Sequence, residues 1–216
     1  PRSTLLPYTT LFRSRDLFTS MDGGTVRNLV LKDVNIGSYG GNTGAITATA
    51  TGASRIYNGG ILSGSIGGTG YTGGLVGLLD GASRVINCYS FGRISGGSVK
   101  GGLVGYNSYA SKSTDIRTMV MNCMFYGDIL PGGDIYPIYG GLEISNEDTP
   151  KLNNYNYFLF EAPFSQDGLI DETHYNRALA AEERYLVRFE FYRYLLNSNR
   201  ELASWYAYGT VQADAR

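Results

Sequence analysis

Short apolar runs separated by glycines dominate the pattern of hydrophobic and polar positions across residues 15–165. Each run is about five residues long and rich in Val, Ile and aromatic side chains, the residues that strands prefer. The gaps between the runs leave almost no room for a helix. The pattern therefore predicts an all-β unit over this part of the chain.

The runs recur as an internal repeat. Residues 84–94 align with residues 119–129, and a looser copy begins at Arg55. A second element, Gly-Gly-Leu-Val-Gly, occurs at 73–77 and again at 101–105. One asparagine marks each copy, at intervals of 29 to 35 residues: Asn28, Asn58, Asn87, Asn122 and Asn156. A fixed period of this length indicates a repeat architecture.

Strands that repeat at this period predict a chain wound into stacked coils, each strand pairing with its counterpart in the next coil. The blades of a β-propeller need about 40–45 residues, so this unit is too short for that alternative. The prediction is an all-β solenoid, a parallel β-helix of about four to five coils. Its right-handed sense follows from the general rule for parallel crossovers.

The composition changes near residue 165. The only glycines in residues 166–216 are Gly168 and Gly209. The same segment contains an apolar stripe with helical spacing. Its members are Ala178, Ala181, Tyr185, Phe189, Tyr192 and Leu196. We therefore expect a β-helix domain over 15–165 and, over 166–216, an α-helical segment that caps the solenoid or begins a further domain.

The first residues are of a different kind. Residues 4–14 resemble the translation of a short-read sequencing adapter and differ from it only at Leu6. We therefore expect residues 1–14 to be foreign and the chain to be a fragment from a metagenomic contig. The true N-terminus, with any signal peptide or lipid anchor, would then be missing.

Composition excludes several classes of function. The formal net charge of −1 offers no basic surface for nucleic acid, and one His excludes His-rich zinc sites. No apolar run reaches the roughly 18 residues of a membrane span. The Gly-x-Gly-x-x-Gly match at 68–73 precedes a strand instead of a helix, and Thr72 stands where a calcium-binding repeat needs Asp. No cofactor and no metal are predicted.

The two interleaved elements carry a family resemblance. Gly-Gly-Leu-Val-Gly at 73–77, followed by Asn87, Cys88 and Tyr89, resembles the GLUG-motif repeat of bacterial surface proteins. The copy at 101–105 is followed by Asn122 and Cys123, and the resemblance spans residues 23–160. It implies a secreted or cell-surface location. The repeat itself has no assigned catalytic residues, and nothing here matches the peptidase domain that some family members carry.

Stacking gives two sets of residues a structural interpretation. Asn58, Asn87 and Asn122 recur one coil apart and predict an asparagine ladder, with a ligand-binding polar row as the alternative. Cys88 and Cys123 occupy equivalent positions and are interpreted as small buried hydrophobic residues. The alternative is a disulfide, because stacked residues lie about 4.8 Å apart, within the Cα range of that bond.

Tyrosines gather near the long insertions of the third and fourth units. Tyrosine offers flat amphipathic area that suits a glycan or a protein, and solenoid loops commonly carry contacts. The candidates for binding a host glycan or glycoprotein are Tyr106, Tyr109, Tyr126, Tyr136 and Tyr139. The alternative is that about half of them belong to the core.

Carboxylates cluster toward the end of the repeats and give a competing interpretation. Carbohydrate-active enzymes use paired carboxylates as acid and base or nucleophile, and Asp128, Asp134 and Glu143 are the candidates. The competing view is a solvated turn at 145–150. We expect a non-catalytic repeat module acting in adhesion, in ligand presentation or as a stalk, with a polysaccharide lyase or glycosidase as the alternative. The remaining expected partners are other parts of a larger surface protein.

Overall fold

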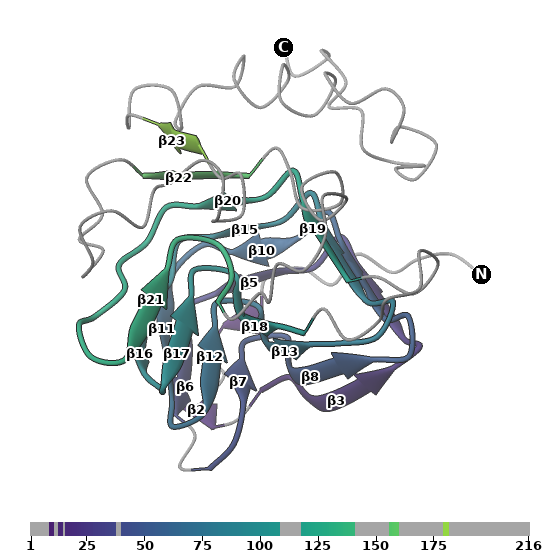
Figure 1. Ribbon diagram of the computed structural model, residues 1–216, viewed down its shortest axis with the longest axis horizontal. Helices are drawn as coiled ribbons and strands as arrows, with labels where there is room; N and C mark the ends of the chain where they lie inside the picture. The colour runs from purple at the N-terminus through teal and green to yellow at the C-terminus, as the bar shows by residue number, and fades with distance from the viewer. Residues whose placement is uncertain are drawn as a thin grey trace.

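The computed structural model describes residues 9–10, 13–14, 16–37, 40–108, 118–140, 156–159 and 179–181. All regular structure in these residues is β-strand, and every strand pairing is parallel. The strands form a solenoid of about three turns, with five sheets that run along the stack (Figure 1). The predicted all-β parallel solenoid is thus confirmed.

Each coil contributes one strand to each sheet in the order C, D, A, B and E. Sheet C contains β3 (Phe18–Asp22), β8 (Thr47–Thr51), β13 (Val76–Leu79) and β18 (Val104–Asn107). Sheet D contains β4 (Thr25–Arg27), β9 (Arg55–Tyr57), β14 (Arg84–Ile86) and β19 (Met119–Met121). Sheet A contains β1 (Thr9–Thr10), β5 (Val30–Lys32), β10 (Gly60–Ile61), β15 (Tyr89–Ser90), β20 (Met124–Phe125), β22 (Tyr157–Leu159) and β23 (Leu179–Ala181).

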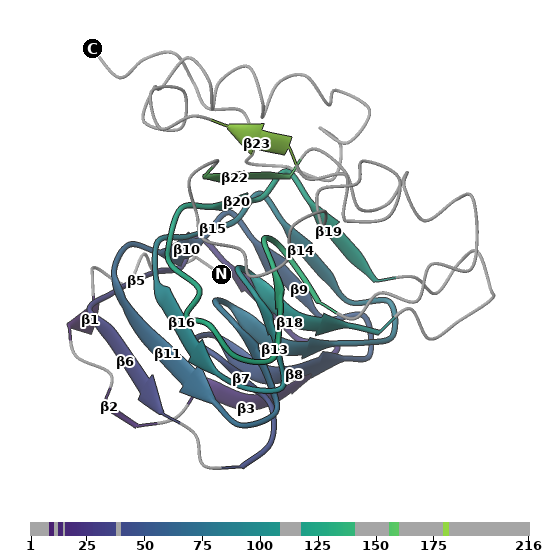
Figure 2. The same ribbon diagram turned by 60° about the vertical axis from the view of Figure 1, so that its left-hand side comes forward.

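The other two sheets lie side by side in both ribbon views (Figure 2). Sheet B contains β2 (Arg13–Ser14), β6 (Val34–Gly37), β11 (Gly64–Gly68) and β16 (Arg93–Gly96). Sheet E contains β7 (Thr43–Gly44), β12 (Tyr71–Gly73), β17 (Val99–Gly101) and β21 (Asp134–Tyr136). From sheet E the chain turns at the E–C corner into sheet C of the next coil.

The core consists of inward-facing columns, because identical registers place equivalent residues above one another. On sheet B the inward column from β6 upward is Ile36, Ile66, Ile94 and Ile129, and all four side chains are buried. One coil alone cannot bury its inner face. The lower end of the stack illustrates this, since Phe18 is 42% exposed while Thr47, stacked on it, is buried.

The Gly-Gly-Leu-Val-Gly element forms the E–C corner. A Cβ on Gly74 would lie 2.5 Å from Oγ of Ser90, so the corner lies directly against sheet A. A Cβ on Gly105 would lie 2.5 Å from the backbone nitrogen of Thr72, so the backbones of sheets C and E meet there. Leu75, which directly follows Gly74, is fully buried. Close backbone approach is therefore the reason for the glycines.

The number of coils is lower than predicted. Each four-stranded sheet spans three turns, whereas the sequence predicts four to five coils. Five asparagine markers enclose only four intervals, and the last marker, Asn156, belongs to a different column of the stack. Counting markers therefore overestimates the number of turns.

The predicted C-terminal helix is wrong at Leu179–Ala181. These residues form β23, which pairs in parallel with β22. The open edge of sheet A offers unpaired backbone groups, and pairing with them overrides the high helix propensity of the two alanines. The rest of the helical segment predicted over 166–216 lies outside the described residues.

Candidate functional site

The asparagine markers occupy the corner between sheets D and A. Asn28, Asn58, Asn87 and Asn122 each have a left-handed backbone, with φ between 52° and 61°. Asparagine tolerates this conformation better than most residues because its short polar side chain can bond locally. The Nδ2 of Asn87 donates to Oδ1 of Asn58 at 2.7 Å. The structure thus brings these two together as rungs of one ladder.

The cysteines lie directly after these asparagines and point inward. Cys88 and Cys123 are free, buried thiols. The Sγ of Cys88 donates to the carbonyls of Ile56 and Ile86, at 3.6 and 3.2 Å. Cys123 repeats the pattern one coil later. Burial, together with the nearby Cys88, raises the pKa of the Cys123 thiol well above its ordinary value. The thiols therefore act as buried hydrogen-bond donors.

Asn156 continues the cysteine column, not the asparagine column. Tyr157 pairs with Met124, which places Asn156 above Cys123. Its Oδ1 accepts from the backbone N–H of Cys123, and its Nδ2 donates to the carbonyl of Val120, both at 3.0 Å. The interpretation of Asn156 as a fifth marker is corrected here. Its amide donates to a backbone carbonyl of the coil below. Each cysteine thiol donates to the carbonyl at the equivalent strand position of the coil below it.

Two predicted tyrosines face outward near the E–C corner. Tyr106 on β18 stacks on Tyr71 of β12, with ring centroids 4.4 Å apart and planes 20° apart. Both side chains are half-buried. Tyr136 ends β21 on sheet E and is also half-buried. Sequence reasoning missed Tyr71, although its place two residues before Gly73 puts it on the same sheet as Tyr136.

The other predicted tyrosines lie elsewhere. Tyr139 pairs with Val104 and is buried, and this burial raises its pKa. Tyr126 makes an edge contact with Phe91 at 5.4 Å, and Phe91 in turn contacts Tyr89. These three rings form a second aromatic cluster. Tyr109 lies outside the described residues.

The two described carboxylates of the enzymatic alternative lie on different sheets. Asp128 is stacked on Arg93 at the outer face of sheet B, with a 3.6 Å ion pair between side chains about 60% exposed. Asp134 is exposed on β21 of sheet E. Burial lowers the pKa of Lys100, which the charge of Asp134 partly opposes. Glu143 lies outside the described residues.

Within the described ranges, no group of three or more His, Cys, Asp or Glu side chains is placed to hold a metal ion. The same part of the chain contains no helix with the length and hydropathy needed to cross a membrane.

Polar side chains also meet at the outer side of the E–C corner. Besides the Tyr71–Tyr106 stack, the Nδ2 of Asn42, just before β7, donates to Oγ1 of Thr49 on β8 at 3.5 Å. The backbone N–H of Tyr71 donates to Oδ1 of Asn42 at 3.4 Å. Side chains from the outer faces of two sheets thus meet each other, and the glycines leave room for them.

A family model described as the GLUG motif matches residues 68–95. This stretch is one full turn, from the end of β11 to β16, and it includes the corner at Gly73 and Gly74. No curated protein and no solved structure is significantly similar to the chain.

Proposed function

Because this chain carries a GLUG repeat within a parallel β-solenoid, we propose that it is a non-catalytic repeat module of a secreted or cell-surface bacterial protein. In this proposal the stacked coils form a stiff scaffold. Their outer faces present side chains to an extracellular partner, such as a host glycan or glycoprotein.

The contrast between inner and outer columns carries the proposal. On sheet B the four inward positions from β6 upward are all isoleucine, whereas the outward column of the same four coils has a different residue in each. These outward residues are Asn35, Ser65, Arg93 and Asp128. A constant core fixes the shape, and freely varying outer residues can be adapted to a partner.

The pairing of Asp128 with Arg93 at the surface favours a module without catalysis. Glycoside hydrolysis needs two carboxyl groups about 5–9.5 Å apart, one on each side of the bond. Asp128 lies on sheet B beside Arg93, and Asp134 lies on sheet E. Exposed ion pairs of this kind are ordinary surface features.

The test compares binding with chemistry in the same preparation of the full chain. Binding to a glycan array and to host glycoproteins is measured beside reducing-sugar release from the same polysaccharides. Binding without release is the expected result. Release that disappears in Asp128→Asn or Asp134→Asn, and persists in the control Asp80→Asn, would replace the proposal with the enzymatic alternative.

A further inference from the structure

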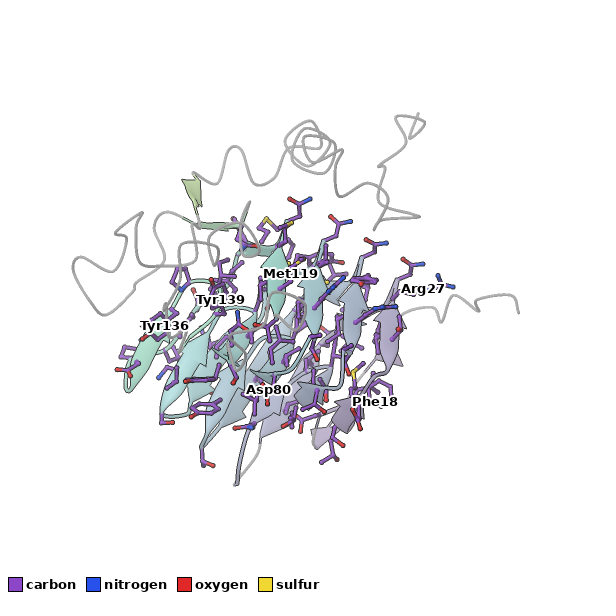
Figure 3. All side chains as sticks on the ribbon, turned by 45° about the vertical axis from the view of Figure 1, so that its right-hand side comes forward. Phe18, Arg27, Asp80, Met119, Tyr136 and Tyr139 are labelled. Carbon is purple, nitrogen blue, oxygen red and sulfur yellow. The ribbon has the colours of Figure 1, made fainter. Side chains whose placement is uncertain are left out.

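We infer that Asp80 and Gly81 form a self-modifying site, at which the aspartate isomerises to isoaspartate through a cyclic imide. The site lies at the corner where the chain leaves β13 of sheet C for β14 of sheet D (Figure 3). The inference is independent of the proposed function, and the only other reactant is water.

The reaction rearranges one peptide bond without changing the composition of the chain. The backbone nitrogen of Gly81 forms a bond to Cγ of Asp80, and the hydroxyl group of the protonated side-chain carboxyl leaves with the amide proton as water. Water then adds to the five-membered ring at the former backbone carbonyl of Asp80. This addition breaks the bond from that carbonyl to nitrogen, so the main chain afterwards runs through Cγ.

The contacts at the corner bring the two reacting groups together. The backbone N–H of Gly81 donates to Oδ1 of Asp80 at 2.7 Å. Because Cγ lies one C–O bond of about 1.2 Å from Oδ1, it is within about 4 Å of the attacking nitrogen. Groups that are held close together react much faster than groups that must first meet. The carboxyl group therefore already lies beside the nitrogen to which it would be joined.

The residue that supplies the nitrogen offers little steric hindrance. Gly81 has a φ of 63°, a conformation that glycine adopts readily, and it has no Cβ to block the approach of the carboxyl group. Asp80 and Gly81 are both half-buried, so water can reach the ring that forms. The corner thus combines proximity, an unhindered nitrogen and access to water.

The same corner two coils below provides a matched comparison. Asp22 and Gly23 form the same dipeptide, and Gly23 has the same left-handed backbone, with a φ of 67°. There, however, the backbone N–H of Gly23 donates to the carbonyl of Thr51 in the next coil, at 3.1 Å. This nitrogen must leave a hydrogen bond of the stack before it can attack a carboxyl group. We therefore expect Asp22 to isomerise more slowly than Asp80.

The experiment follows both dipeptides in one preparation of the full chain. The protein is kept at pH 6 and 37 °C in water enriched in oxygen-18, because each opening of the imide ring fixes one oxygen atom from the solvent. Trypsin separates the two sites, since cleavage after the arginines gives one peptide of residues 16–27 and another of residues 56–84. Fragmentation by electron transfer locates the heavy oxygen and distinguishes isoaspartate from aspartate.

In the folded protein, isoaspartate should form at Asp80 at least about fivefold faster than at Asp22. In concentrated urea the two sites should react within about twofold of each other, because the contacts that distinguish them are lost. Asp80→Glu should reduce incorporation of heavy oxygen at position 80 by about tenfold or more, since its side chain would have to close a larger ring.

The inference is overturned if the folded protein forms isoaspartate no faster at Asp80 than at Asp22. It is equally overturned if the ratio of the two rates is the same in urea, because the fold would then have no part in it. Undiminished incorporation in the Asp80→Glu variant would place the reaction at another residue and would also overturn the inference.

Discussion

Asn87 donates a hydrogen bond from Nδ2 to Oδ1 of Asn58, one coil away, across 2.7 Å. Both residues also have the left-handed backbone that turns the chain from sheet D to sheet A, with φ of 61° and 52°. One residue type therefore meets two requirements at this corner: a tight turn and a bond along the stack. This explains why asparagine marks the repeat.

Asn87→Ala should lower the free energy of unfolding by about 2 kcal/mol, since it combines backbone strain with a lost hydrogen bond. Asn87→Gly loses only the bond and should cost about half as much. Chemical denaturation measures both values. The control Asn35→Ala, at an exposed position of β6, should change stability by less than about 0.5 kcal/mol. Equal losses for the alanine and glycine variants would contradict a role for the left-handed backbone.

Gly74→Ala should destabilise the solenoid by about 2–3 kcal/mol. The new Cβ would lie 2.5 Å from Oγ of Ser90 and also collide with the backbone carbonyl of Gly102. The backbone of the next coil cannot move without disturbing sheet A. Gly37→Ala is the matched control, because a Cβ there meets nothing within 4 Å. Thermal unfolding of both variants separates a tight corner from a general effect of alanine.

The buried thiols should not react with a disulfide reagent at pH 8 until the protein unfolds. The pKa of Cys123 is raised by burial, so this thiol stays protonated in the folded state. Its contribution to stability is complete below the ordinary pKa of about 8.5 and decreases as pH rises above it, because the unfolded chain loses the proton first. Cys123→Ala should flatten this alkaline loss. Rapid labelling of native protein would show that the thiols are accessible.

Lys100→Ile should raise the free energy of unfolding by about 1 kcal/mol at neutral pH. Lys100 is 1% exposed, and in its column Thr72 lies below it and Ile135 above it. Burial lowers its pKa, so the charged form costs energy at pH 7. This cost shrinks as pH rises through the lowered pKa toward the ordinary value of about 10.4, so the two proteins should converge there. A destabilised Lys100→Ile variant at pH 7 would contradict the prediction.

The stacking of coils was predictable from the sequence because its determinants are local. The glycines of the two Gly-Gly-Leu-Val-Gly copies, at 73–77 and 101–105, recur wherever the chain must approach its own backbone closely. The division into five sheets was not predictable. Strands such as Tyr89–Ser90 contain two residues, too few for an alternating pattern to reveal which side faces inward.

Errors about single residues arise from register. The sequence pattern aligns Asn156 with Asn122, whereas pairing of Tyr157 with Met124 aligns it with Cys123, one residue later, and turns Asn156 inward. A shift of one residue exchanges the inner and outer faces of a strand. Tyr139, expected near a binding surface, is buried for the same reason, because it is stacked on Val104.

The corner between sheets C and D tolerates extra length. The coil grows from 29 residues between Arg55 and Arg84 to 35 between Arg84 and Met119, yet strand pairing continues on both sides of the added residues. Asp80 marks the equivalent corner one coil below (Figure 3). For protein engineering this makes the bend after Asp80 a permissive insertion point. An epitope tag placed between Gly81 and Ala82 should be displayed without changing how the coils assemble.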